Sequence, residues 1–154
     1  MAQILWQLEV DDAGLRQRLN QWSGRAAAAP GNAVQQAGVA LLQNIIAANP
    51  VDSGRSRSAW VAALEDLGGS PPDGWEGNHP DPAAIADGAS LGSAEFSDNG
   101  THAEVSFFNG VDYIDLLEYG DIGRRPRAMV RRNLPAALAE LAARLLEGMD
   151  RAES

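Results

Sequence analysis

Two segments of this chain repeat apolar residues at three- and four-residue spacing, and each is long enough to form a helix that spans a domain. Residues 32–49 and 128–149 each carry such a stripe, which buries one face of a helix. Pro50 disfavours continuation of the first helix beyond it. Pro135 lies inside the second stripe, so that helix is kinked there or begins at Asn133. The fold must therefore supply an apolar surface for two long helices.

Short segments with alternating apolar and polar residues predict that surface. The alternation covers residues 4–10 and 102–108, as expected for half-buried strands. The dipeptide Asn-Gly at residues 99–100 favours a hairpin turn, so residues 93–97 are expected to pair with 102–108. The predicted fold class is α+β, with two long helices packed on a small, mostly antiparallel sheet.

Shorter elements are expected between these segments. A short helix is predicted over residues 12–22, followed by a small-residue connection over 23–31. Residues 60–64 are too few for periodicity to distinguish a strand from a helical turn. The Asp-Pro dipeptide at 81–82 is typical of a helix start, and residues 111–119 have helical spacing.

The length of the chain favours one domain over residues 1–154. The stretch 65–98 is predicted to be a loop-rich acidic insertion, because residues 68–82 are rich in Pro and Gly. Residues 150–154 are expected to form a frayed tail.

Charge is distributed unevenly along the chain. All twelve basic residues are arginine, and the net charge is −9. Residues 61–123 hold thirteen acidic residues and no arginine, whereas residues 124–154 hold seven arginines and four acidic residues. This balance argues against a protein that mainly binds duplex DNA. An acidic and a basic surface on one chain can meet between copies, or the acidic surface serves solubility.

The sequence offers no recognisable catalytic or metal centre. The absence of cysteine excludes disulfides and thiol chemistry. His79 lies near several acidic residues, but the spacing matches no metal-ligand signature. The serines of residues 53–58 have neither a nearby histidine nor a Gly-x-Ser-x-Gly motif. We therefore predict no enzyme activity, no metal and no other cofactor, and we expect His102 to be a surface or interface residue.

Arginines are concentrated where the last helix begins. Arginine suits bidentate pairing with carboxylates and phosphates. The cluster favours a subunit interface with the acidic segment, although a solvated helix start and contact with a DNA backbone remain open. Its members are Arg124, Arg125, Arg127, Arg131 and Arg132.

Four short segments carry a resemblance to a known family. Residues 50–60 read Pro-Val-Asp-Ser-Gly-Arg-Ser-Arg-Ser-Ala-Trp, and residues 109–113 read Asn-Gly-Val-Asp-Tyr. Residues 117–120 read Leu-Glu-Tyr-Gly, and residues 125–131 read Arg-Pro-Arg-Ala-Met-Val-Arg. In this order, after an N-terminal strand and an amphipathic helix, they resemble the minor tail and tail-completion proteins of long-tailed bacteriophages. The resemblance covers residues 4–145.

The resemblance implies a structural virion protein of the phage neck, at the head–tail junction. Such a protein assembles in the bacterial cytoplasm as a ring of six copies, which completes the tail and joins it to the filled head. Its implied partners are the head connector or head-closure protein, the tail terminator or tail tube, and DNA that passes through the lumen without sequence-specific binding. The alternative is a small nucleic-acid-binding protein that uses the cluster at Arg124–Arg132. Neither hypothesis involves a membrane, since no apolar run is long enough to span one.

Two motifs of the resemblance have a direct conformational interpretation. Asp52 and Ser53 are expected to satisfy backbone N–H groups in the turn that contains Gly54. Gly120 is expected to need a positive φ after the short helix, just before the loop that contains Pro126. Both motifs are therefore assigned structural roles.

The remaining motif residues are assigned to packing and pairing. Glu118 is an acidic residue in an otherwise apolar segment, so we expect Arg55 or Arg57 to pair with it. These three residues and the arginine cluster are the candidates for a subunit interface. Tyr113 and Tyr119 are expected to be packing residues and not ligands.

Overall fold

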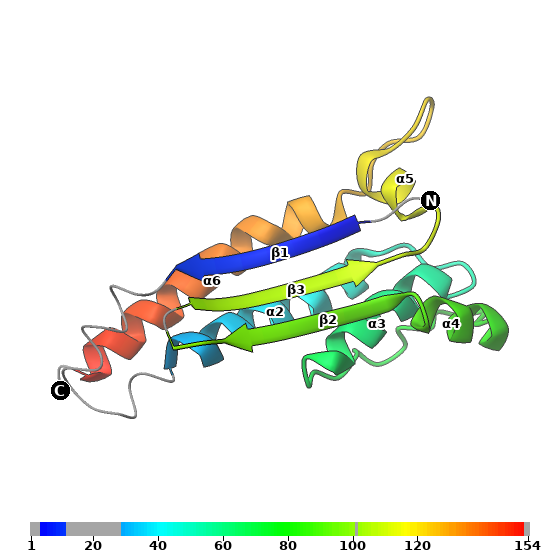
Figure 1. Cartoon of the computed structure of the whole chain (residues 1–154). Coiled ribbons are helices and arrows are strands. Elements are labelled where there is room, and N and C mark those ends of the chain that lie inside the picture. The colour runs from blue at the N-terminus through cyan, green and yellow to red at the C-terminus, as the bar shows by residue number, and fades with distance from the viewer. Residues whose placement is uncertain (1–3, 12–28, 101, 153–154) are drawn as a thin grey trace.

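The computed structural model describes residues 4–11, 29–100 and 102–152 (Figure 1). The predicted helix over residues 12–22 and most of the predicted connection over 23–31 lie outside them. The elements in chain order are β1 (Ile4–Asp11), α2 (Ala29–Ala48), α3 (Arg55–Asp66), α4 (Pro82–Ala89), β2 (Gly92–Asp98), β3 (His102–Asn109), α5 (Ile114–Tyr119) and α6 (Met129–Ala152).

The strands form one antiparallel sheet in the order β1-β3-β2. β3 pairs with β1 through registers such as Trp6 with Phe107, and with β2 through Phe96 with Val105. The predicted hairpin between β2 and β3 is confirmed. Its turn has Gly100 at a φ of 90°, a conformation that favours glycine.

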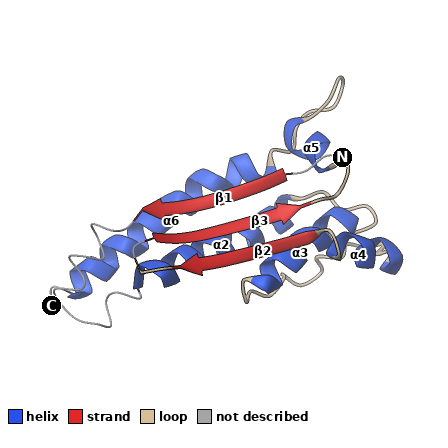
Figure 2. Cartoon of the chain, viewed as in Figure 1, coloured by secondary structure: helices blue, strands red, loops and turns tan. Residues whose placement is uncertain are grey.

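The long helices all lie on one side of the sheet (Figures 1 and 2). α2 and α3 pack on β3, and α6 packs along α2. Alternate β3 side chains, including Val105 and Phe107, are buried beneath them. Trp60 of α3 meets Phe107 edge-on, with ring centroids 6.1 Å apart. The predicted α+β class, with two long helices on a small antiparallel sheet, is confirmed.

α3 settles the alternative left open for residues 60–64, which are helical. Its N-cap is Gly54, which has a φ of 88° and no side-chain cap hydrogen bond. The prediction that Asp52 and Ser53 cap this turn with their side chains is therefore wrong for the start of α3. The carbonyl of Ser53 accepts a hydrogen bond from the Asp81 N–H at 3.2 Å, which ties this turn to the start of α4.

Several predicted boundaries shift. α2 begins at Ala29, so residues 29–31 belong to the helix and not to a connection. α6 begins at Met129 and includes Pro135, which excludes the alternative start at Asn133. α6 also continues through Ala152, so residues 150–152 are helical and not part of a frayed tail.

The stretch 65–98, predicted to be loop-rich, contains a loop over residues 67–81, all of α4 and all of β2. The start of α4 is confirmed, because the Asp81 carboxylate accepts hydrogen bonds from the N–H groups of Ala83 and Ala84.

Candidate functional site: the arginine hairpin

A narrow hairpin projects between α5 and α6 (Figure 1). We call residues 120–127 the arginine hairpin. Asp121 and Arg124 close its tip through reciprocal backbone hydrogen bonds of 3.1 and 2.9 Å. Ile122 at the tip is fully exposed. The hairpin therefore presents an apolar tip and three arginines on a short, closed backbone turn.

Gly120 fixes the base of the arginine hairpin. Its φ of 79° confirms the predicted positive value. A Cβ at this position would lie 2.7 Å from the carbonyl oxygen of Arg124 and 2.9 Å from the nitrogen of Pro126. Both the conformation and the space therefore require glycine here.

Glu118 anchors α5 to the start of α6. Its side chain is fully buried, and it accepts hydrogen bonds from the N–H groups of Val130 and Arg131 at 3.1 Å each. The Arg131 side chain donates to the same carboxylate at 3.1 Å, and to the Glu118 carbonyl at 2.6 Å. A carboxylate at a helix N-terminus satisfies donors that have no partner inside the helix. Glu118 thus performs the capping that Ala128, just before α6, cannot.

The predicted pairing of Glu118 with Arg55 or Arg57 is wrong, and its partner is Arg131. The sequence pattern indicated correctly that Glu118 pairs with an arginine, but it could not identify which arginine. A single hairpin connects α5 to α6. The start of α6 therefore lies next to Glu118, and its backbone N–H groups and Arg131 bind the carboxylate.

Arg55 instead joins three elements around the start of α3. It donates hydrogen bonds of 2.6 Å to Asp87 of α4 and to Asp112 before α5. These two hydrogen bonds raise the pKa of the Arg55 guanidinium. The guanidinium also lies over the ring of Tyr113, 5.8 Å from its centroid. Neither carboxylate partner was identified from the sequence.

Arg57 holds the loop between α3 and α4. It donates to the carbonyl oxygens of Asn49 at 2.6 Å and Trp75 at 2.9 Å. Partial burial lowers its pKa. Arg57 therefore fastens this loop to the end of α2, and this role inside the chain was not predicted.

An open groove lies beside the arginine hairpin. It has a volume of about 710 Å³. Pro50, Leu116 and Leu117 contribute apolar walls, and Tyr113 and Pro126 complete them. The charged side chains that line it are Arg124, Arg125, Arg127 and Arg132.

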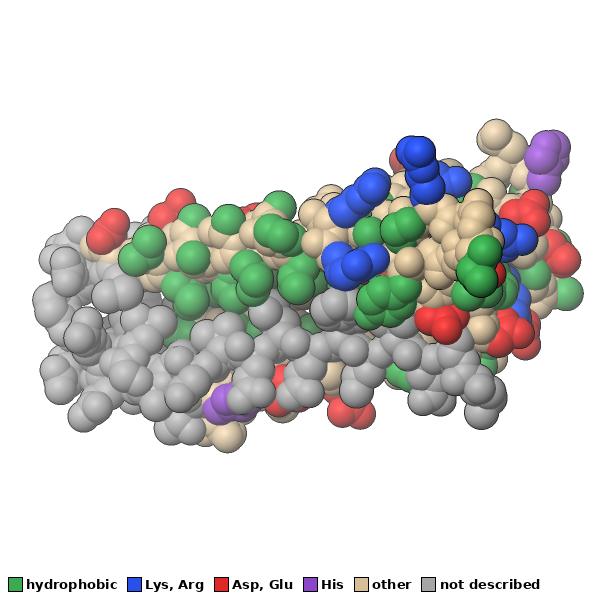
Figure 3. Space-filling model, turned by 90° about the horizontal axis from the view of Figure 1, so that it is seen from above, with side chains coloured by type: hydrophobic (Ala, Val, Ile, Leu, Met, Phe, Trp, Pro, Cys, Tyr) green, Lys and Arg blue, Asp and Glu red, His purple; other side chains and the backbone are tan. Residues whose placement is uncertain are grey.

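The arginine cluster is otherwise exposed (Figure 3). Arg131 lies over the ring of Tyr119, 4.8 Å from the centroid, in the geometry of a cation–π contact. Tyr113 packs against the hydrophobic core, in agreement with its predicted packing role. Tyr119 is 55% exposed and contacts Arg131, so the packing prediction is wrong for Tyr119. The exposed arginines can donate hydrogen bonds to carboxylates or phosphates of another molecule.

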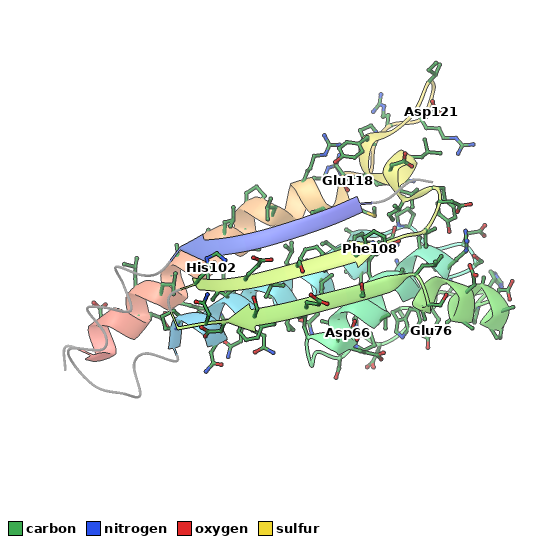
Figure 4. All side chains as sticks on the ribbon, in the orientation of Figure 1. Asp66, Glu76, His102, Phe108, Glu118 and Asp121 are labelled. Carbon is green, nitrogen blue, oxygen red and sulfur yellow. The ribbon has the colours of Figure 1, made fainter. Side chains whose placement is uncertain are left out.

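Acidic side chains occupy the opposite edge of the molecule. We call residues 65–87 the acidic edge. Figure 4 shows Asp66 and Glu76 on the α3–α4 side, far from Asp121 on the arginine hairpin. Five of its six carboxylates are exposed and Glu76 is half-buried. The six are Glu65, Asp66, Asp73, Glu76, Asp81 and Asp87.

Residues 4–11, 29–100 and 102–152 contain no group of three or more acidic or histidine side chains that could hold a metal ion. His79 is exposed, and His102 is half-buried beside Glu104, 3.4 Å away. None of the described helices is long and apolar enough to cross a membrane. The expectations of no enzyme activity and no cofactor stay predictions.

No protein-family model, curated protein or solved structure matches this chain. The resemblance to tail-completion proteins therefore rests on the four sequence segments alone.

The backbone of Ala128 has a strained conformation that should lower the stability of the fold. Its φ is 51°, although it is not glycine. For an L-residue the left-handed conformation costs about 1 kcal/mol. We expect Ala128→Gly to raise the free energy of unfolding by about 1 kcal/mol in urea titration. Ala139→Gly, at an exposed site inside α6, is the control and should lower it by about 1 kcal/mol. Equal effects of the two substitutions would contradict this interpretation.

Proposed function

We propose that this chain is a structural virion protein of the phage neck, which forms a ring that completes the tail and joins it to the DNA-filled head. The observation that carries the proposal is an uneven distribution of charge: exposed arginines gather at the arginine hairpin, near Asp112, Asp115 and Asp121, whereas the acidic edge contains no arginine. The arginine hairpin and the start of α6 carry exposed arginines, whereas the acidic edge carries exposed carboxylates. The resemblance in sequence supplies the biological setting.

A charge distribution of this kind suits head-to-tail assembly. The arginine hairpin of one copy can meet the acidic edge of the next copy. The same contact then repeats, and the ring closes if the rotation between neighbouring copies is a whole fraction of a turn. Potentials of opposite sign favour this orientation and oppose contacts between like edges. A ring of six copies remains the number that the resemblance implies.

The uncovered face of the sheet suits the lumen of such a ring. No described helix covers this face (Figure 2). β2 and β3 place Glu95 and Glu104 on this face, and neither strand contains an arginine. A surface without cations makes few phosphate contacts, so DNA could slide past it without sequence-specific binding. The proposed protein partners are the head connector or head-closure protein above and the tail terminator or tail tube below.

Nucleic-acid binding by the isolated chain is the competing function. The four arginines that line the groove favour it, because guanidinium groups bind phosphate well. This function predicts binding of an oligonucleotide duplex that weakens steeply as salt rises.

Charge reversal of the hairpin distinguishes the two functions. Arg124→Glu with Arg125→Glu should shift the chain from ring to monomer, measured by light scattering at low salt. Arg131 is left intact because it holds Glu118. The matched control is Arg124→Gln with Arg125→Gln, which removes charge without reversing it and should weaken the ring less.

Fluorescence anisotropy with a labelled duplex is measured on the same proteins. The proposal expects no salt-dependent duplex binding by the unchanged chain. The competing function would be favoured if charge reversal left the mass in light scattering unchanged but abolished duplex binding.

A further inference from the structure

The groove beside the arginine hairpin is formed within a single chain. Its apolar walls come from α5 and Pro50, and its arginines come from the hairpin and α6. The hydrogen-bonded pair Asp121 and Arg124 closes the hairpin, and Gly120 holds its base. A preformed groove lowers the entropic cost of binding.

A segment on the acidic edge has the complementary chemistry. Within residues 70–80, Asp73 is exposed and Glu76 is half-buried, and the segment contains no arginine. Its backbone is held at several points. Trp75 donates to the carbonyl of Pro72 at 3.3 Å, and its own carbonyl accepts from Arg57 at 2.9 Å. The backbone of this acidic segment is therefore held in place, and the Asp73 carboxylate is exposed.

The occupant of the groove must come from another molecule. The acidic segment does not line the groove of its own chain. Arg57 holds it against the carbonyl of Asn49, next to the groove residue Pro50. A chain therefore cannot place its own segment in its own groove without breaking these contacts. A second copy can do so, because Asp73 and Pro72 of its acidic segment are exposed.

We propose that the Pro72–Glu76 segment of a second copy occupies the groove beside the arginine hairpin. The carboxylates of Asp73 and Glu76 pair with groove arginines, since a guanidinium group can donate two parallel hydrogen bonds to one carboxylate. Pro72 packs against the apolar wall that Leu116 contributes. This inference rests on the ring proposed above, and it specifies the contact that repeats around that ring.

Cysteine cross-linking tests the contact directly, because the chain contains no cysteine of its own. Pro72→Cys and Leu116→Cys are combined in one chain, which leaves every charge in place. Pro72 is exposed, and Leu116 is 41% exposed in the groove. Mild oxidation should give a ladder of disulfide-linked multimers on a non-reducing gel.

The matched control pair is Ser97→Cys with Leu116→Cys, since Ser97 is exposed on β2 and outside the acidic segment. We expect about tenfold more cross-linked product from the test pair, as expected for thiols held at high effective concentration. A ring seen by light scattering without this excess would overturn the contact and leave the ring intact. Absence of both ring and excess cross-linking would overturn the contact and the ring together.

A charge swap gives a second readout if the cysteine pair does not fold. Asp73→Arg and Arg125→Asp should each weaken assembly, and the double variant should restore it. Restoration by the swap supports the contact. Failure of the swap, when each single variant is folded by circular dichroism, would overturn it.

Discussion

Replacing Glu118 by alanine should lower the free energy of unfolding by about 3 kcal/mol or more. The carboxylate is fully buried and accepts hydrogen bonds from two N–H groups at the start of α6. Its removal leaves the buried Val130 N–H without this acceptor, and an unsatisfied buried donor is costly. Arg131 also loses its ion-pair partner. The measurement is urea unfolding followed by circular dichroism.

The control for this prediction is Glu140→Ala. Glu140 also pairs with an arginine, Arg144 at 2.6 Å, but that pair is exposed on α6. Exposed ion pairs contribute little, so this control should change the free energy of unfolding by less than about 1 kcal/mol. Equal losses from the two substitutions would contradict the role of Glu118 as the buried anchor of α6.

The second large effect is expected from Gly92→Ala. Gly92 begins β2, and a Cβ there would lie 1.8 Å from the carbonyl oxygen of Ala59 in α3. Because the clash is with backbone, α3 or β2 must move. Forced overpacking of this kind costs about 3 kcal/mol. We expect that loss in urea unfolding.

Gly148→Ala is the matched control for Gly92. Gly148 lies in α6, and a Cβ there would meet no atom within 4 Å. Alanine is favoured over glycine inside a helix, so this variant should gain about 1 kcal/mol. A neutral Gly92→Ala would mean that α3 and β2 are not in such close backbone contact.

The sequence alone predicts the elements with clear periodicity. The alternation in residues 102–108 and the Asn-Gly turn identify β3 and its hairpin, because a half-buried strand repeats every two residues. The α2 and α6 stripes are equally clear, since each helix buries one face. Residues 60–64 resist this reasoning because α3 is buried on most sides. Trp60, Val61, Ala63 and Leu64 are all buried, so no simple polar period marks the helix.

The candidate site is predictable only in part. Glu118 and Gly120 were identified because an acid among apolar residues and a glycine after a helix have local causes. The partners of Arg55 and Glu118 depend on how α4, α5 and α6 meet, and no local pattern encodes that arrangement. The groove cannot be predicted from the sequence either, because only the fold brings Pro50 next to the arginine hairpin.

The mass of the purified chain in solution is the direct test of ring assembly. Light scattering at low and high salt compares that mass with the 16.3 kDa of one chain. We predict a closed assembly of several copies at low salt that dissociates as salt screens the contacts between edges of opposite charge. A mass of one chain at every salt and protein concentration would contradict assembly of the ring from its own charged edges.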